Sequence, residues 1–539
     1  MARWATFRRD TAWQSKPHKA LFLACAGLLS FYLSYVLFLA NSPIFTGTLE
    51  TAASVFWFAA CAALFFAGLV WGCRKLAGIS VPTANEKGGN SPGFMGISLA
   101  LSLLLLGCSF LACYPGGVSY DVYNQWVQAQ TGLYNGWHPV FHTLLMGLGM
   151  RLAGRYPWVV AMQIVCFGGA LAYLMDTLRA WGVPKALLLI AQGLIVASPL
   201  VDSSLMYLWK DNAMTMGAVV LCAYSVNVYF TRGAWLDRPR NAVLTGLALA
   251  FTTLVRHNAM FYTVPLLLCL LLCYRARWKR LLLAAGVTAL CLGLVTGVVY
   301  SALDIIQPEN TLEESVGIPM TVLMDARLKN PEALDAETAA FLRELADDEL
   351  FAAKYREGNY NSIKFEYPRE RISRTPPDKL LRMVASAVAG DPRTAFAAVN
   401  NVTDLVWDVT GKGEGTESVR NSGDLAEYPF LNTRWNQLGK SLQKLIQIPL
   451  GWPPVTWVFR NIGVQQLALL LCALWALYRS GPRALPLCVP VLLYNLGTML
   501  LLCGNDARFF QFSMVISIPT MFALCREPGG RNEEQTAWN

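Results

Sequence analysis

The chain has 539 residues, of which 55% are hydrophobic and only 15% are charged. Soluble domains carry about 25% charged residues, so this composition leaves too little polar surface for a soluble protein. The net charge is +9, but the basic residues lie in short clusters between apolar runs, which argues against nucleic-acid binding. The composition predicts an all-α polytopic membrane protein.

Apolar runs that are nearly free of charge recur along the chain. About 20 apolar residues in a helix cross the ~30 Å hydrocarbon core of a bilayer. The first run follows several basic residues, as in a signal peptide, but it is too long for an h-region of about 7–15 residues and is predicted to be an uncleaved span. We predict about twelve transmembrane helices, at residues 20–40, 52–73, 95–113, 158–178, 184–200, 212–231, 241–255, 259–274, 281–299, 455–478, 484–503 and 508–525.

The turns between these runs alternate in charge. Basic residues gather in every second turn, for example at Arg74/Lys75, at 275–280 and at Arg479/Arg483. Lysine and arginine favour the cytoplasmic side, so we expect both termini in the cytoplasm and the protein in the plasma membrane. Counting 138–152 as a span would place the 275–280 cluster outside, so this segment is predicted to be a re-entrant or interfacial helix.

The predicted spans divide the chain into four parts. Most of the acidic residues lie in one long polar segment on the non-cytoplasmic side. Near its end, residues 435–448 form an amphipathic pattern that favours the membrane surface. The parts are a two-span segment at 1–93, a membrane core at 94–300 with interfacial helices at 119–152, a loop domain at 301–454, and the last spans with a tail at 455–539.

All fourteen cysteines lie within or beside apolar runs, and the segment 301–454 has none. An exterior domain held together by disulfides is therefore excluded. We interpret the cysteines as small buried hydrophobic residues.

Four clusters of polar residues fall at predicted helix ends on the non-cytoplasmic side. Charged groups at such depths are costly unless they pair or serve a function, although snorkelling and structural ion pairs are the plainer explanation for any single residue. Neighbours in a helix do not face each other, so Lys210 and Asp211 should have separate partners. The clusters are Asp121 with His138 and His142, Lys210-Asp211-Asn212, Arg256-His257-Asn258, and Asn505-Asp506 with Arg508.

The first predicted non-cytoplasmic loop carries the most distinctive pattern. Pro115 and two glycines end the preceding span, and Ser119 is placed to cap a new helix. We expect this helix to lie at the interface with its apolar stripe in lipid. Its polar face carries Asp121, Asn124, Gln125 and Gln128, and its apolar face Val122, Trp126, Ala129 and Leu133.

A second interfacial helix is expected to follow Trp137-His138-Pro139, with His138 and His142 one turn apart. Two histidines at this spacing could bind a divalent metal. The glutamate of an HExxH motif is missing and a third ligand is not evident. A metal pair is therefore the weaker interpretation.

These elements resemble the GT-C class of membrane glycosyltransferases, and among them the protein mannosyltransferases and a bacterial branch of the class. The resemblance spans roughly residues 95–525. It rests on the acidic residue of the first loop, on the aromatic-His-Pro element that follows, and on three short motifs. These motifs are Trp209-Lys210-Asp211, Val255-Arg256-His257-Asn258 and Asp506-Ala507-Arg508-Phe509-Phe510. It implies a GT-C-like fold, a polyprenyl-phosphate sugar donor, and a cell-envelope glycan, lipid or protein as acceptor.

Two motifs of the class are absent. The first loop reads Tyr120-Asp121-Val122-Tyr123, without the Asp-x-Asp of metal-dependent relatives and without the Asp-Glu pair of protein mannosyltransferases. The sequence therefore assigns no cofactor and leaves a divalent metal open.

The resemblance places the catalytic carboxylate at Asp121, which would take the acceptor proton as general base. Desolvation at the interface is expected to raise its pKa. The departing phosphate needs cations, for which we assign Arg256 first, then Lys210 and Arg508, with His257 as a further donor. The remaining candidates for substrate contacts are Asn124, Gln125, His138, His142, Asp211, Asn258 and Asp506.

Two other functions are open at this stage. A polysaccharide polymerase or ligase of the other GT-C architecture also carries a long outer loop. A lipid or polysaccharide transporter would be expected to show charges at the bilayer midplane and inverted repeats. The charges of this chain lie at one face, and its halves show no symmetry, which favours the glycosyltransferase.

Overall fold

A computed structural model describes residues 16–77, 79, 81–84, 89–308, 312–368, 370–411 and 431–528. Within them the chain is helical, apart from two short strands that pair with each other, β1 (Thr83–Ala84) and β2 (Glu527–Pro528). Before the long polar segment the α-helices are α1 (Lys16–Leu37), α2 (Thr48–Leu76), α3 (Pro92–Ala112), α4 (Tyr120–Thr131), α5 (Val140–Ala153), α6 (Tyr156–Ala180), α7 (Lys185–Ala197), α8 (Pro199–Ser204), α9 (Lys210–Phe230), α10 (Pro239–Val255), α11 (Met260–Cys273), α12 (Trp278–Gly293) and α13 (Tyr300–Ala302). Those that follow are α14 (Gly317–Lys329), α15 (Ala336–Leu345), α16 (Asp348–Lys354), α17 (Glu370–Ser373), α18 (Pro377–Gly390), α19 (Pro392–Trp407), α20 (Gln437–Gln447), α21 (Pro453–Phe459), α22 (Ile462–Ser480), α23 (Leu485–Met499) and α24 (Gln511–Leu524).

The protein is an all-α polytopic membrane protein. Each predicted span overlaps a helix, and in the described part eight helical stretches are long and apolar enough to cross a bilayer. One of these eight, Ile462–Met499, contains both α22 and α23. The helices α5 and α7 are apolar but shorter than a bilayer is thick. Eight spanning stretches are thus shown, and the remaining predicted spans stay predictions.

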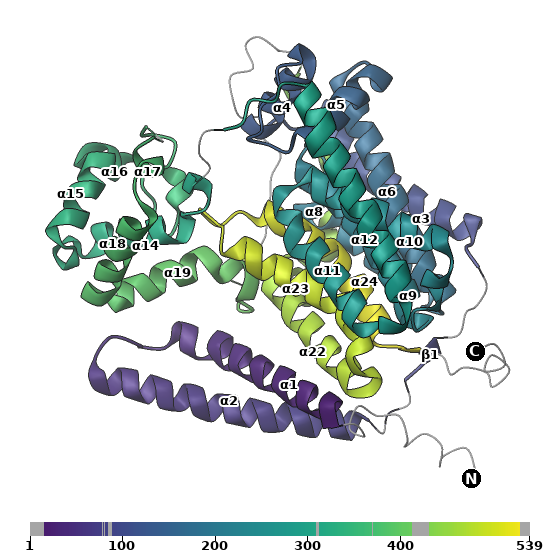
Figure 1. Ribbon diagram of the computed structural model, residues 1–539, viewed down its shortest axis with the longest axis horizontal. Coiled ribbons are helices and arrows are strands. Elements are labelled where there is room, and N and C mark those ends of the chain that lie inside the picture. Colours follow the sequence, from purple (N-terminus) through teal and green to yellow (C-terminus); the bar gives the residue numbers. More distant parts are fainter. Residues whose placement is uncertain are drawn as a thin grey trace.

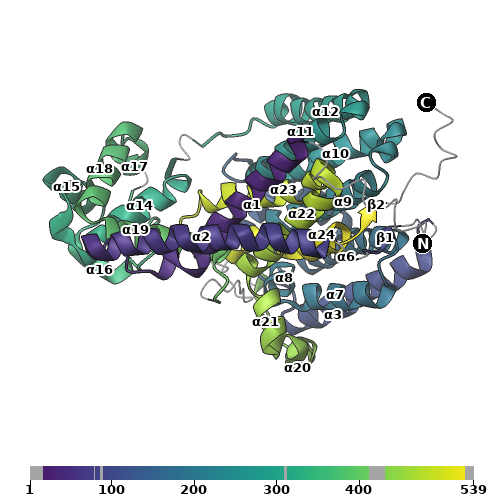
Figure 2. The ribbon, with the colours of Figure 1, turned by 90° about the horizontal axis from the view of Figure 1, so that it is seen from below.

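A bundle built around α3, α6, α9, α10 and α24 forms the main core, and the α1–α2 hairpin lies along one side of it (Figure 1). Figure 2 shows that α2 extends beyond the bundle, to the level of α16 and α19. The hairpin meets the bundle where the ring of Phe22 packs edge-on against Tyr478, with 5.1 Å between ring centroids. Large apolar side chains of α2, among them Trp57 and Leu64, are exposed. In a polytopic membrane protein such side chains face lipid.

The helices α14–α19 form a separate helical region, at the left of Figure 1. Its apolar residues make a core of their own around Leu323, Leu342 and Tyr360. Several contacts join this region to the bundle: α19 packs on α22, the N–H of Asn361 donates to the carbonyl of Cys503, and Asn505 donates to Asp404 at 3.0 Å. The apolar core explains why this polar segment folds into helices although it lies between membrane spans in the chain.

The basic turns gather at one end of the bundle. The hydroxyl of Tyr274 donates to the carbonyl of Arg483, and Arg479 pairs with Glu527 at 3.1 Å beside the β1–β2 pair. The helices α4 and α5 lie at the other end (Figure 1). The side chains described next are found at that second end, where α9 and α24 begin and α10 ends.

The environment of α4 differs from the prediction. Ser119 caps the helix as expected, since its side chain accepts from the N–H of Val122. The apolar face does not lie in lipid, because Val122 and Trp126 are buried against α6 in the protein core. Of that stripe, Leu133 is exposed. An amphipathic pattern requires an apolar partner for one face, and here the partner is protein.

Candidate functional site

Two glycines bring the start of α4 close to the start of α9. Gly116 has a φ of +121°, and a side chain on Gly117 would collide with the ring of Tyr207. The N–H of Gly117 donates to the carbonyl of Met206, and the hydroxyl of Tyr156 donates to the carbonyl of Gly117. The loop before α4 therefore packs directly on the loop before α9.

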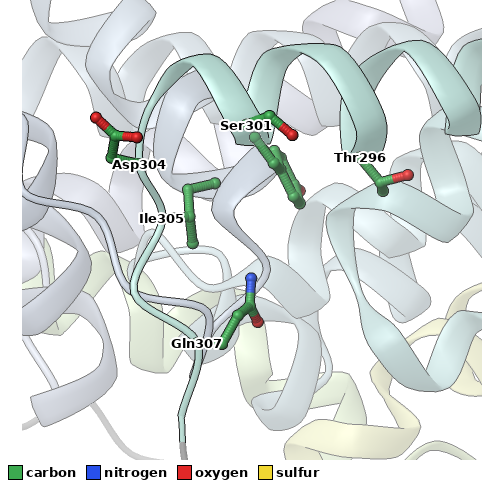
Figure 3. A pocket seen from close by; sticks show the side chains of 6 residues that line it. Thr296, Ser301, Asp304, Ile305 and Gln307 are labelled. Atoms are coloured by element: carbon green, nitrogen blue, oxygen red, sulfur yellow. The ribbon is translucent and has the colours of Figure 1, made fainter.

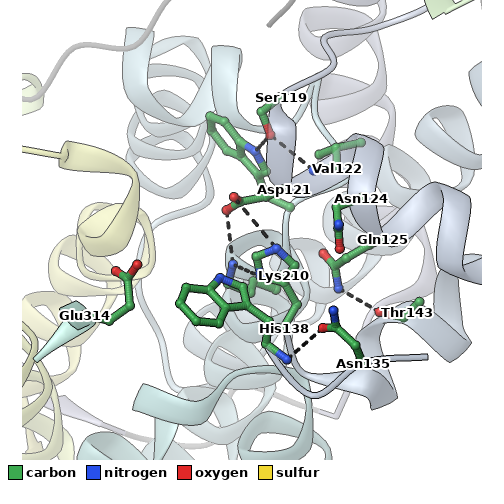
Figure 4. A network of polar contacts seen from close by, with 12 residues as sticks. Ser119, Asp121, Val122, Asn124, Gln125, Asn135, His138, Thr143, Lys210 and Glu314 are labelled. Carbon is green, nitrogen blue, oxygen red and sulfur yellow. Dashed lines mark hydrogen bonds and ion pairs between the residues drawn. The ribbon is translucent and has the colours of Figure 1, made fainter. Parts of the chain in front are cut away.

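This packing places Asp121 of α4 beside Lys210 and His138 (Figure 4), and Arg508 also reaches its carboxylate. One carboxylate oxygen lies 3.2 Å from Nζ of Lys210, at the start of α9, and 3.2 Å from Nη1 of Arg508. Arg508 belongs to a short helical turn, η13 (Ala507–Phe510), and also pairs with Asp506 at 2.9 Å. The side chain of Asp121 is 27% exposed, so the cluster is in contact with solvent.

His138 completes the cluster. Its Nδ1 lies 3.3 Å from Nζ of Lys210, and its Nε2 lies 3.9 Å from the second carboxylate oxygen of Asp121. Burial, together with the charge of Lys210, lowers the pKa of His138 to about 3. The ring is therefore neutral at physiological pH. Because an ammonium group can only donate, Nδ1 accepts and the proton sits on Nε2, toward Asp121.

The expected pKa shift of Asp121 was wrong in direction. Burial alone raises the pKa of this carboxyl, but the charges of Lys210 and Arg508 outweigh it and hold the pKa well below its usual range. The sequence pattern shows that the residue lies near an interface, whereas the sign of the shift depends on cations from other helices.

A second ion pair lies beside the cluster. The guanidinium of Arg256, at the end of α10, pairs with the carboxylate of Asp211 on α9. Both side chains are at most 5% exposed. The ring of Phe509 contacts both arginines, with its centroid 4.9 Å from the guanidinium carbon of Arg256 and 5.0 Å from that of Arg508. Lys210 and Asp211 thus have separate partners, as predicted.

This arrangement changes which cations are the better candidates for contact with a phosphate. Lys210 and Arg508 contact Asp121 directly. Arg256 is buried behind them against Asp211. A ligand that enters beside Asp121 meets Lys210 and Arg508 first.

The other predicted residues lie around the cluster. Gln125 donates to the hydroxyl of Thr143 at 2.9 Å (Figure 4). Asn124 is exposed and accepts from Gln128. His257 and Asn258 follow Arg256 in a short turn, η4 (His257–Ala259), at the same end of the bundle.

The predicted helical histidine pair is absent. His138 precedes α5, whereas His142 lies within it and is buried, with no hydrogen-bond partner for Nδ1 in the described part of the chain. Among the described residues no group of three or more His, Cys, Asp or Glu side chains could hold a metal ion. A divalent cation at Asp121 would have to displace Lys210 and Arg508. The residues at this position therefore do not fit a resident metal.

Two aromatic residues that position the cluster were given no role at the site by the sequence analysis. The indole N–H of Trp209 donates to Ser119 at 2.8 Å, and the guanidinium of Arg508 lies over the Trp209 ring. Trp209 stacks on Tyr207 with 4.1 Å between centroids. The Trp-Lys-Asp sequence was the available signal, because the tryptophan directly precedes Lys210.

Asp202 on α8 was also missed. It is 3% exposed and accepts hydrogen bonds from Gln443 at 2.7 Å and from Gln447 at 3.4 Å, both on α20. Burial raises the pKa of Asp202 to about 6, although hydrogen bonds from Ser109 and Gln443 lower it. A single acidic residue in an apolar segment gives no periodic signal by which it could be found.

A cavity of about 290 Å³ flanks this end of the bundle (Figure 3). It is lined by the segment that follows α12, from Thr296 to Gln307, including Tyr300 and Asp304. The same segment pairs with the loop that leads to His138, since the N–H of Gly136 donates to the carbonyl of Ile306 at 2.8 Å. The hydroxyl of Tyr300 accepts from the N–H of Phe141, in the first turn of α5. The loop that leads to His138 and the first turn of α5 are thus hydrogen-bonded to the segment that lines this cavity.

A family model described as a family of unknown function (DUF6020) matches residues 99–366. The match contains Asp121, His138, Lys210 and Arg256, but Arg508 lies outside it. A search of curated proteins finds no match.

Proposed function

We propose that this protein is a GT-C-type membrane glycosyltransferase that moves a sugar from a polyprenyl-phosphate donor to a cell-envelope glycan, lipid or protein. The observation that carries the proposal is the carboxylate of Asp121, which lies 3.2 Å from both Lys210 and Arg508 and is partly open to solvent. One position thus offers both a proton acceptor and two cations.

The proposed reaction uses each of these groups. The acceptor hydroxyl attacks the anomeric carbon of the sugar, and its proton passes to the carboxylate of Asp121. The bond between the anomeric carbon and the phosphate oxygen breaks, and its electron pair leaves with the polyprenyl phosphate. Lys210 and Arg508 stabilise the charge that develops on this phosphate. His138 stays neutral beside the carboxylate, with its Nε2 3.9 Å away.

The low pKa of Asp121 gives the donor a second role. In the structure the two cations hold the carboxylate in its ionised and weakly basic form. A phosphate that takes over Lys210 and Arg508 would remove part of their effect on Asp121, and the pKa of Asp121 would rise toward its ordinary value. We therefore propose that Asp121 becomes an effective base only when the donor is bound.

The proposal includes about twelve spans with both termini in the cytoplasm and Asp121 on the non-cytoplasmic side of the plasma membrane. The gathering of basic turns at the end of the bundle opposite to α4 and α5 supports this orientation. The polar helical region α14–α19 lies on the same side as Asp121 in this topology.

The test is an activity screen of the purified protein in lipid nanodiscs with radiolabelled polyprenyl-phosphate sugars. Release of the sugar is followed with water as acceptor and with membrane extracts as a source of larger acceptors. We expect turnover of at least one donor and its loss in Asp121→Asn. Movement of a lipid across vesicles without turnover of any donor would replace the glycosyltransferase by a transporter.

A further inference from the structure

A second pocket, of about 410 Å³, lies on the opposite side of α4 from Asp121. Four segments form this pocket: α4, the end of α5, the start of α6 and the non-helical segment that precedes α20. Its walls are largely aromatic and apolar, with Tyr114, Trp126, Tyr156 and Met150 among them. The ring of Trp126 packs edge-on against Tyr156 at 5.0 Å, so this wall is part of the protein core.

The polar groups of this pocket are suited to an anion. Arg155 and Arg434 line it from two separate segments, and no carboxylate is found among the described residues that line it. The pocket lies at the N-terminal end of α6, a helix of 25 residues whose dipole favours negative charge. Arg155 is the residue that directly precedes this helix.

A buried donor without a partner points to a ligand. Trp126 is 3% exposed, and its Nε1 has no acceptor within the described part of the chain. A buried N–H that lacks an acceptor costs about 1–3 kcal/mol, so such groups are rare in native proteins. A bound oxyanion in the pocket would supply the missing acceptor.

The surroundings of Arg434 indicate where this anion comes from. The next residue, Trp435, begins an amphipathic segment that continues in α20 and α21 and projects beside α3 and α7 in Figure 2. Apolar side chains of this segment are exposed, with Leu438, Leu445 and Trp452 each more than 60% accessible. A helix of this kind lies in the interfacial plane of a membrane, at the level of the lipid headgroups.

We propose that this pocket binds the headgroup phosphate of an anionic phospholipid. Arg155 and Arg434 would contact the phosphate oxygens, and Trp126 would donate its N–H. The aromatic wall would contact the glycerol and the first carbons of the acyl chains. The site is separate from the Asp121 cluster and independent of the function proposed for that cluster.

The test measures binding of phosphatidylglycerol to the full-length, delipidated protein by native mass spectrometry, with phosphatidylcholine as comparison. The double variant Arg155→Ala/Arg434→Ala should bind phosphatidylglycerol at least tenfold more weakly. Trp126→Phe keeps the ring and removes the donor, and should weaken binding severalfold.

The matched control is Arg151→Ala/Lys444→Ala, which removes two exposed charges from the neighbouring α5 and α20 without touching the pocket. It should change binding less than twofold. An equal loss in both double variants would show general attraction to charge and would overturn the site. Displacement of the lipid by inorganic phosphate at millimolar concentration would show a site for free phosphate instead. Thermal unfolding of each variant establishes that it is folded.

Discussion

Charged side chains are arranged differently at the α4–α9 end of the bundle and on the helical region α14–α19. On α18, Arg382 and Asp378 form an exposed pair at 2.6 Å, and both side chains are nearly 70% accessible. At the bundle end, Arg256 and Asp211 pair with at most 5% exposure, and Asp121 faces two cations at once. Exposed pairs contribute about 0–1 kcal/mol, whereas an unpaired buried charge costs several times more. At the bundle end, each charged side chain is therefore stable only because its partner of opposite charge is present.

The largest effect is expected at Asp121. Asp121→Asn keeps the size of the side chain and removes the proton acceptor, so turnover of the sugar donor should fall by about 10²–10⁴-fold. The initial rate of sugar release in nanodiscs measures this loss. Asp237→Asn, at the basic end of the bundle, is the matched control and should keep the wild-type rate. Near-full activity of Asp121→Asn would reduce Asp121 to a structural residue.

Arg256→Ala should be the most destabilising of the charge removals, because it leaves the buried carboxylate of Asp211 without its partner. The expected loss is about 3–5 kcal/mol of unfolding free energy. Denaturant unfolding in mixed micelles measures it. The double variant Arg256→Met/Asp211→Leu should recover most of the loss. If Arg256→Ala were as stable as the wild type, the pair would have no role in holding α9 against α10.

The raised pKa of Asp202 predicts that the stability of the protein depends on pH. Its pKa is about 6 in the folded protein, above an unfolded value of about 4. The protonated form is therefore favoured in the fold, and this stabilisation is complete below about pH 4 and lost as the pH rises through 6. Asp202→Asn removes the titration. Its stability relative to the wild type should rise between about pH 4 and 6.5, by on the order of 2–3 kcal/mol in total. A constant difference over this range in thermal unfolding would contradict the shift.

The smallest effect is expected on α18. Arg382→Ala removes one member of an exposed i,i+4 pair. It should change the unfolding free energy by less than about 0.5 kcal/mol. Thermal unfolding beside Arg256→Ala gives the direct comparison. A loss as large as that of Arg256→Ala would remove the distinction between the two regions.

Much of the fold could be predicted from the sequence, because the membrane requires long apolar helices and the runs are visible. The cap at Ser119 and the separate partners of Lys210 and Asp211 also follow from local rules. The lipid environment predicted for Val122 and Trp126 was wrong. Periodicity shows that a helix has an apolar face, but not whether lipid or protein covers it.

The candidate site could be predicted only in part. Asp121, Lys210 and Arg508 were singled out from their places at helix ends, and the structure brings them into contact. The low pKa of Asp121 could not be predicted, since it depends on distances between segments that are far apart in the chain. The same holds for the burial of Arg256 and for the helical histidine pair, which fails because α5 begins after His138.

Donor binding by Asp121→Asn tests the central claim most directly. If Asp121 competes with the donor phosphate for Lys210 and Arg508, its replacement frees both cations. The variant should then bind a polyprenyl-phosphate sugar as tightly as the wild type or more tightly, while its turnover is lost. Lys210→Met should bind the same donor about tenfold or more weakly, the cost of one charged hydrogen bond. Donor affinity that falls in Asp121→Asn as far as in Lys210→Met, with both variants folded, would contradict the division of this site into a base and a phosphate anchor.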